Sequence, residues 1–306
     1  MRVLVVKHHG VDSAGFIGAA FEALGAEITA HLVPDDGPLP ALDGVDHVLV
    51  LGAESSVNDP DPWIAEELAW LRTADEAGVP VLGICFGAQV ICAAFGGKVE
   101  ALARKEIGWR LVDSWDHELV PVGPWLEFHG DRCRPPKAAE VLARNDVGVQ
   151  AFRLGRHLAV QFHPEVDGPL LKRWLDAGGD QDAEQVGLDP GQFLAQTIRE
   201  EPGARARAGR LVAAALRLAG QGRAAQAGTA RGGPRLPTDP DRQPGYPLTP
   251  GRLYRAVMVA CMTANGRWLP SANASPRQTT SVRPARTTSP VIANRCPAAG
   301  ASRLIV

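Results

Sequence analysis

Short apolar segments recur through the first part of the chain and are separated by longer amphipathic segments. Each apolar segment is rich in Val, Leu and Ile without a polar residue at every second position, which is typical of strands buried on both faces of a parallel sheet. These segments are residues 2–6, 28–33, 46–51 and 79–84. Alternation of such strands with helices predicts an α/β fold with a doubly wound, mostly parallel sheet flanked by helices.

The segments between the strands have helical spacing and recognisable ends. Ser13 is expected to cap a helix over residues 16–25, and Asp61 with Pro62 is expected to open a helix that ends at Gly78. After Gly97 the apolar runs become shorter and predict a small antiparallel extension. Those runs are residues 98–103, 108–113, 148–155 and 157–163, and a last helix is expected over 205–220.

The composition changes after residue 220. Residues 221–306 contain twelve Arg, no Lys, two Asp and no Glu, and they are rich in Pro, Ala and Gly without a sustained period. Such a segment buries too little apolar surface to offset the entropy of ordering, so we expect a disordered tail. Either a natural flexible tail or translation in an unintended frame fits this composition. The sequence therefore predicts a folded domain over 1–220 and a disordered Pro/Ala/Arg-rich tail over 221–306.

Charge and cysteine usage exclude several classes of protein. The first 220 residues are acidic, which argues against a nucleic-acid surface on the folded part. The five cysteines form no CxxC pair, and the opening MRVLVVKHHG lacks the length of a secretion or membrane segment. His residues are too scattered to predict a metal site, because three or four ligands must converge. We expect a cytoplasmic protein with no metal, cofactor, nucleic-acid or membrane partner.

Cys85 stands between two glycines at the end of the strand 79–84. A sharp strand-to-helix turn lifts a side chain out of the sheet and needs small neighbours, which Gly83 and Gly87 supply. The helix that follows turns its unpaired N–H groups toward this side chain, which favours negative charge there. Cys85 is therefore a candidate nucleophile, whereas Cys92 is interpreted as a core residue. A small buried Cys at a tight turn is the structural alternative for Cys85.

A cysteine nucleophile needs a base, and the base needs a residue that orients it. His163 ends the segment HLAVQFH and is followed by Pro164 and Glu165. Pro164 ends the strand, so the carboxylate of Glu165 can hold one ring nitrogen while the other faces the thiol. An oxyanion would need backbone donors: the N–H of Phe86, and the loop after residue 51, where Gly52 and Ala53 allow close approach of a substrate.

These segments resemble the class I glutamine amidotransferases, in particular the glutaminase domain of GMP synthase and its stand-alone relatives. GICFGAQ resembles the family's G-x-C-x-G-x-Q motif, QFHPE its histidine–glutamate signature, and LGAESSVND its strand-end loop. EIGWRLVD and FHGD are similar to further segments of the same relatives. The resemblance runs in order from about residue 45 to 166, and it implies the flavodoxin-like fold of that family.

The resemblance implies that L-glutamine is the substrate and that Cys85, His163 and Glu165 are the catalytic triad. It implies hydrolysis of the side-chain amide to glutamate and ammonia through a cysteine thioester. Read without the family, Gln89 is interpreted as a helix-surface residue and His129 as a loop histidine. The resemblance instead implies these roles: oxyanion donors on the backbone of Ala53 and Phe86, and substrate contacts at Gly52, Gln89 and the loop of His129, Gly130 and Asp131.

Two departures from the family keep alternatives open. Ala53 and Glu54 stand where the family has Gly-Pro, so an oxyanion hole that needs a glycine conformation would form poorly or only when a partner docks. No SGGxDS or GxxxxGK[ST] segment occurs, so the ammonia has no acceptor site here and a partner synthetase or a free-standing hydrolase must be supposed. The alternative functions are a hydrolase of other γ-glutamyl amides and a catalytically silent, glutaminase-like binding protein.

Overall fold

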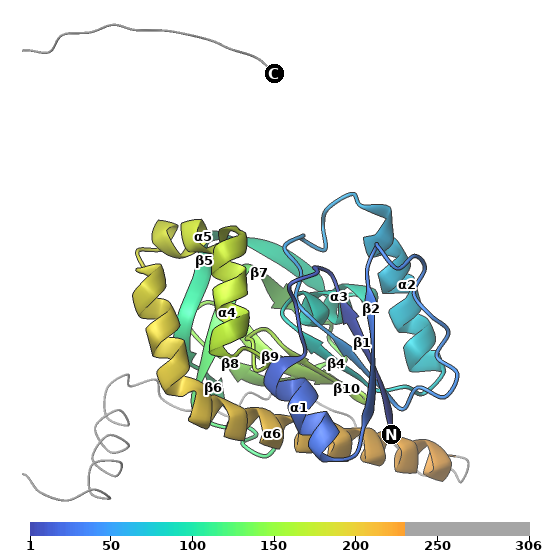
Figure 1. Cartoon of the computed structure of the whole chain (residues 1–306). Helices are drawn as coiled ribbons and strands as arrows, with labels where there is room; N and C mark the ends of the chain where they lie inside the picture. Colours follow the sequence, from blue (N-terminus) through green and yellow to red (C-terminus); the bar gives the residue numbers. More distant parts are fainter. Residues whose placement is uncertain (230–306) are drawn as a thin grey trace, which may run out of the picture. The chain divides into compact units, whose positions relative to one another are not determined.

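The computed structural model describes residues 1–229, with side chains up to residue 220. One ten-stranded sheet runs through this part of the chain in the order β2-β1-β3-β4-β10-β9-β7-β5, with β8 beside β9 and β6 beside β8 (Figure 1). The strands are β1 (Arg2–Lys7), β2 (Glu27–Leu32), β3 (His47–Val50), β4 (Val81–Ile84), β5 (Lys98–Leu111), β6 (Asp113–Ser114), β7 (Pro124–Arg134), β8 (Glu140–Arg144), β9 (Val149–Leu154) and β10 (His157–Val160).

Half of the sheet is parallel and half is antiparallel. Strands β2, β1, β3, β4 and β10 pair in parallel, whereas β9, β7, β5, β8 and β6 pair in antiparallel fashion. The predicted α/β sheet with an antiparallel extension is thereby confirmed. Strand β10 joins the halves, because it is parallel to β4 and antiparallel to β9.

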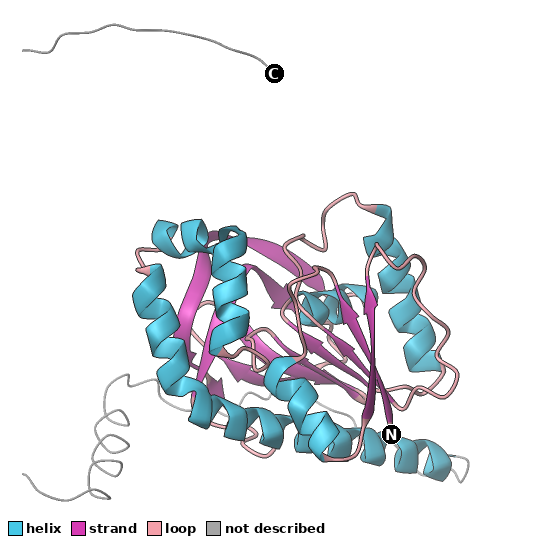
Figure 2. Ribbon diagram, in the orientation of Figure 1, coloured by secondary structure: helices cyan, strands magenta, loops and turns pink. Residues whose placement is uncertain are grey.

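Helices cover both faces of the sheet, as Figure 2 shows. Alternate residues of each parallel strand face opposite sides: Val3 and Val5 pack with helices α1 and α6, while Leu4 and Val6 pack with α2 and α3. A third, smaller core lies under α4 and α5. The helices are α1 (Gly15–Ala23), α2 (Pro62–Glu76), α3 (Phe86–Ala94), α4 (Gly168–Trp174), a π-helical turn (Leu175–Gly179), α5 (Asp180–Gln185) and α6 (Pro190–Thr229).

Several details of the predicted elements differ from the structure. Ala14, not Ser13, is the N-cap of α1, whereas Asp61 precedes α2 as expected. Strand β2 lies at the sheet edge and is largely exposed, although its composition predicted a buried strand. The last helix, expected over 205–220, begins at Pro190 and continues to Thr229 through Pro202. The remainder of the predicted tail, from residue 230, lies outside the described residues.

None of the helices in the described part of the chain combines the length and the apolar character needed to cross a membrane.

Candidate active site

Cys85 occupies the sharp bend between β4 and α3. Its φ of 53° and ψ of −106° make it the one non-glycine residue with positive φ among the described residues. Such a conformation costs roughly 1–3 kcal/mol and is typical of functional sites. A Cβ atom on Gly83 would overlap the carbonyl of Gly87, and one on Gly87 would overlap the carbonyl of Val50. The bend therefore requires both glycines, as the sequence predicted.

His163 and Glu165 leave the end of β10 together and meet Cys85 at the carboxyl edge of the sheet. Nδ1 of His163 lies 2.7 Å from Oε1 of Glu165. Its Nε2 is buried without a well-aligned hydrogen-bond partner, and Cys85 lies within interaction distance of the ring. A Cβ atom on Gly52 would lie 3.2 Å from Cε1 of His163 and 3.8 Å from Cβ of Cys85. The structure thus brings the predicted thiol, imidazole and carboxylate to one point.

The charges around His163 favour its protonated form. Burial by itself lowers the pKa of His163, but the negative charges of Glu165 and of the Cys85 sulfur raise it well above its ordinary value. The edge of Trp174 also packs against the ring, with the centroids 4.9 Å apart. A positive charge on an imidazole beside a cysteine sulfur favours the thiolate form that acts as a nucleophile.

A cavity of about 620 Å³ opens above Cys85 and His163. Gln89 points into it from the first turn of α3 and is 3% exposed, so it is not the helix-surface residue expected from the sequence without the family. Glu165 and Phe86 lie outside the wall of the cavity; Glu165 is behind His163, and Phe86 begins α3, where its N–H has no intrahelical acceptor. The other predicted site residues that line it are Gly52, Ala53, His129, Gly130 and Asp131.

The loop after β3 is held against β7 on the other side of the cavity. Ser56 Oγ donates a hydrogen bond of 2.5 Å to Oδ2 of Asp131. Ala53 is not among the residues with positive φ. The replacement of the family's glycine by Ala53 therefore introduces no backbone strain at this position.

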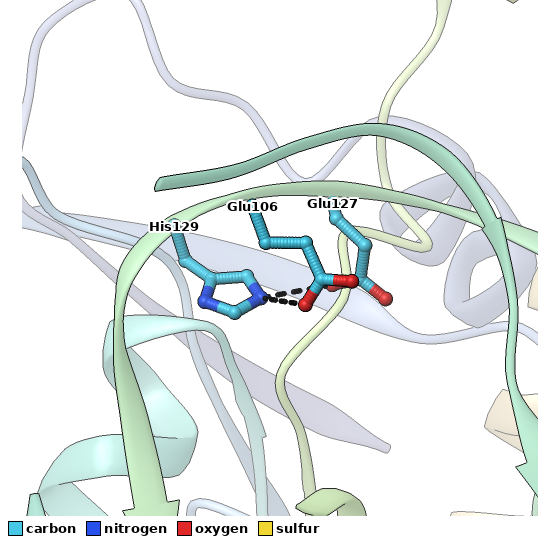
Figure 3. Close-up of side chains that lie close together, drawn as sticks. All are labelled: Glu106, Glu127 and His129. Carbon is cyan, nitrogen blue, oxygen red and sulfur yellow. Dashed lines mark ion pairs between the residues drawn. The ribbon is translucent and has the colours of Figure 1, made fainter. Parts of the chain in front are cut away.

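His129, Gly130 and Asp131 lie on β7 rather than on the loop that we expected. Strand β7 pairs with β5, and the register of that pair shifts between Ala101 and Glu106. Pairing brings His129 opposite Glu106, and this contact depends on strand register, which the sequence does not reveal locally. Figure 3 shows that the side chains of Glu106, Glu127 and His129 converge.

Both ring nitrogens of His129 are used inside the protein. Nδ1 lies 2.8 Å from the carbonyl oxygen of Asp131, and Nε2 lies 3.1 Å from Oε2 of Glu106 and 3.2 Å from Oε2 of Glu127 (Figure 3). Gln150 and Asn145 donate to Glu106. Burial lowers the pKa of His129, but Glu106 and Glu127 more than offset this and raise it to about 10. His129 is therefore a buried imidazolium. Its Nδ1 is hydrogen-bonded to the Asp131 carbonyl, and its Nε2 faces the two carboxylates without a well-aligned hydrogen bond.

The same three side chains are the candidate metal ligands of the described residues. One atom from each lies within 4.8 Å of the other two, and one imidazole with two carboxylates suits a divalent cation. The distances from Nε2 to the two carboxylates also fit a protonated His129 paired with them, although Nε2 and both oxygens of Glu127 make no well-aligned hydrogen bond among the described residues. The expectation of no metal thus remains a prediction, which metal analysis of the purified protein checks.

Replacing Glu127 with Gln is expected to lower the pKa of His129, because one of the two carboxylates that raise it is removed. In the native chain the raised pKa contributes stability that is fully present below about pH 6.5 and is lost as pH rises through about 10. In the variant this contribution is smaller, and its loss is complete at lower pH. NMR titration of the His129 ring measures the shift, with exposed Glu118→Gln as the control; equal titration in both variants would refute the assignment.

Sequence reasoning missed several residues of the cavity wall. Asp12 follows β1 and accepts a hydrogen bond of 3.0 Å from Nε1 of Trp174. Burial is the main cause that raises the pKa of Asp12. Lys105 and Phe128 also line the cavity. Asp12, Trp174 and Lys105 reach the cavity through contacts between distant segments and stand in none of the motifs, whereas Phe128 begins the FHGD segment.

The model of one protein family matches residues 16–173 of the chain, more than half of its length; its description is glutamine amidotransferase class-I. The chain belongs to this family. The match includes the cysteine bend, the strand-end loop and the His163–Glu165 turn. The chain is accordingly a class I glutamine amidotransferase, as the motifs predicted.

Named relatives agree with this membership. A GMP synthase [glutamine-hydrolyzing] of Thermomicrobium roseum is 36% identical over 174 residues, which cover 53% of this chain and 31% of that protein. A Thermus thermophilus protein of the same name is 31% identical over 185 residues, covering 55% and 35%. The chain thus spans about a third of the length of these curated relatives.

Among solved structures, a glutamine amidotransferase from Thermotoga maritima is 25% identical, with a TM-score of 0.65, and the match covers 72% of this chain and 98% of that one. The Thermotoga maritima protein therefore shares the fold of this chain over nearly its whole length.

Proposed function

We propose that this amidotransferase hydrolyses the side-chain amide of L-glutamine to glutamate and ammonia, with Cys85, His163 and Glu165 as the catalytic residues. One observation carries the proposal: the three side chains lie together at one end of the cavity. The sulfur stands on a bend that requires glycine at positions 83 and 87. The family match supports glutamine as the nitrogen donor on which the chain acts.

The proposed reaction has two steps. The Cys85 thiolate attacks the amide carbon, and the oxyanion that forms is stabilised by the backbone N–H groups of Ala53 and Phe86. The His163 imidazolium then gives its proton to the leaving nitrogen, so ammonia departs and a γ-glutamyl thioester remains. In the second step His163 takes a proton from water, and the hydroxide attacks the thioester carbon. The tetrahedral intermediate then expels the Cys85 thiolate, which restores the starting thiolate and imidazolium, and the acid product gives its proton to ammonia as glutamate leaves.

Substrate binding is assigned to residues around the cavity. Gln89 and the backbone of Gly52, Gly130 and Asp131 are proposed to contact the substrate. Because both ring nitrogens of His129 face acceptors within the protein, we propose that His129 acts through its positive charge and by holding the Asp131 carbonyl, not through a hydrogen bond to glutamine.

The fate of the ammonia is part of the proposal. GMP synthases are the named relatives, and the chain spans about a third of their length. By analogy with them, we propose that the ammonia passes to a partner synthetase. A cytoplasmic location is proposed as well, since the three described cysteines are free thiols.

Glutamate and ammonia released from L-glutamine by the purified full-length chain test the proposal. We expect glutaminase activity that is lost in Cys85→Ala. A chain that releases no glutamate, alone or with a synthetase present, and that does not react at Cys85 with a glutamine-like electrophile would contradict the proposal.

The size of the cavity supports one second candidate. A cavity of about 620 Å³ is within the range of sites for drug-sized ligands and exceeds the needs of a single amino acid. The extra room fits a substituent on the amide nitrogen, as in a γ-glutamyl amine. Comparison of kcat/KM for glutamine and for γ-glutamyl amines distinguishes the two candidate functions. Activity confined to the γ-glutamyl amines would favour the second candidate over glutamine hydrolysis.

A further inference from the structure

His8 lies buried behind the loop that follows β3. Its side chain is 3% exposed. Its Nδ1 lies 2.9 Å from the carbonyl oxygen of Gly52, and its Nε2 lies 2.9 Å from Oε2 of Glu67. A carbonyl oxygen can only accept a hydrogen bond, so Nδ1 of His8 carries a proton and donates it to Gly52, while Nε2 pairs with the Glu67 carboxyl group.

Glu67 and His8 form a fully buried ion pair. Glu67 is 0% exposed, and its second oxygen, Oε1, has no hydrogen-bond partner among the described residues. Burial lowers the pKa of His8, but the hydrogen bond and charge of Glu67 more than offset this, and the net pKa is raised. A buried ion pair of this kind rarely adds stability over apolar residues. The pair also fixes the direction of the Gly52 carbonyl, because that carbonyl accepts a hydrogen bond from the other ring nitrogen of His8.

The direction of that carbonyl sets the direction of the next N–H. In a trans peptide the carbonyl of Gly52 and the N–H of Ala53 point opposite ways. Gly52 and Ala53 line the cavity above Cys85, whereas His8 does not. With the carbonyl bound to His8 on the protein side, the N–H of Ala53 is directed to the cavity side.

The same imidazole contacts the residue that carries the second oxyanion donor. The His8 ring packs edge-on against the Phe86 ring, with centroids 4.8 Å apart, and Trp63 packs against it at 5.4 Å. These rings fix the plane of the imidazole. His8 thus contacts both Gly52, which precedes one proposed donor, and Phe86, whose own N–H is the other.

We propose that the His8–Glu67 pair holds the Gly52–Ala53 peptide with its N–H turned into the cavity, and so preforms half of the oxyanion hole. The inference rests on the function proposed above. It explains how a loop with Ala53 and Glu54 in place of Gly-Pro keeps this peptide in one orientation. The hydrogen bond from His8 to the Gly52 carbonyl fixes the peptide, whereas the backbone of the loop alone does not. Without it, the peptide can rotate and present its carbonyl oxygen to the oxyanion. His8 and Glu67 are positioning residues, because neither lines the cavity.

Two amide substitutions separate this role from general packing. The amide nitrogen of Asn falls near Nδ1 of His, and that of Gln near Nε2. His8→Asn therefore keeps the bond to Gly52 and loses Glu67, whereas His8→Gln keeps Glu67 and loses Gly52. In the full-length chain, we expect His8→Gln to lower kcat by about 10- to 100-fold with little change in KM, and His8→Asn to retain most of kcat.

His47→Gln is the matched control. His47 is also buried, and its Nδ1 lies 3.0 Å from the carbonyl of Val48, but it begins β3 at the other end of that strand. Its replacement is expected to change stability and leave kcat unchanged.

Crystal structures of the native chain and both His8 variants supply a readout that does not need turnover. We expect the Gly52 carbonyl to turn toward the cavity in His8→Gln and to stay in place in His8→Asn. An unchanged peptide with unchanged kcat in His8→Gln, or equal kcat losses in the two variants, would overturn the inference. A native chain that turns over no glutamine while the peptide still rotates in His8→Gln would reject the proposed function and not the positioning role.

Discussion

We expect Cys85→Ala to abolish the proposed glutamine hydrolysis and to leave the fold intact. The substitution removes the sulfur that forms the thioester, and loss of the nucleophile in comparable triads costs about 10⁶-fold in kcat. Alanine keeps a Cβ at φ of 53°, so the strained bend is not relieved and stability changes little. Initial rates of glutamate release and thermal unfolding together measure the expected result.

Cys92→Ala is the control for this experiment. Cys92 lies on the same helix, is buried, and its Sγ lies 3.3 Å from the carbonyl oxygens of Lys98 and Arg134. Its replacement should lower the free energy of unfolding by about 1 kcal/mol or more. Both the glutaminase activity and the reaction of Cys85 with a glutamine-like electrophile should be retained. Retention of activity in Cys85→Ala would remove the cysteine from the mechanism.

His163→Gln is expected to lower kcat by about 10⁴-fold or more, because glutamine can form a hydrogen bond but cannot carry a proton between sulfur, leaving nitrogen and water. The substitution also removes the positive charge next to the sulfur, so alkylation of Cys85 by iodoacetamide at neutral pH should slow. Steady-state kinetics and the alkylation rate measure the two effects separately.

His157→Gln is the matched control, at the start of β10, the strand that leads to His163. His157 is buried, and its Nε2 lies 3.1 Å from Oδ1 of Asp75 at the opposite end of β10. We expect lower stability with kcat retained. Equal kcat in His163→Gln and the native chain, or an unchanged alkylation rate, would contradict the role given to His163.

The sequence was most informative where the chemistry is local. The bend at Cys85 needs Gly83, Gly87 and a strand-to-helix switch within a few residues, and the His163–Glu165 contact spans two residues around a proline. The apolar runs of the parallel strands predicted the α/β fold for the same reason, because the composition of each run indicates that its strand is buried on both faces.

Long-range contacts escaped the sequence because no local pattern records them. His129 was placed on a loop, yet it lies on β7, and its partner Glu106 is brought there by the pairing of β5 with β7. His8 and Glu67 are far apart along the chain and meet only when β1 and α2 pack. The edge position of β2 likewise depends on sheet order rather than on its composition.

Rapid acid quenching of the native chain with L-glutamine, followed by peptide mass spectrometry, is the most direct test of the central claim. The account predicts that the peptide containing Cys85 gains the mass of a γ-glutamyl group, that Cys85→Ala gains none, and that the adduct decays as glutamate forms. Turnover of glutamine with no adduct on Cys85 at any time, or with an adduct on another residue, would contradict it.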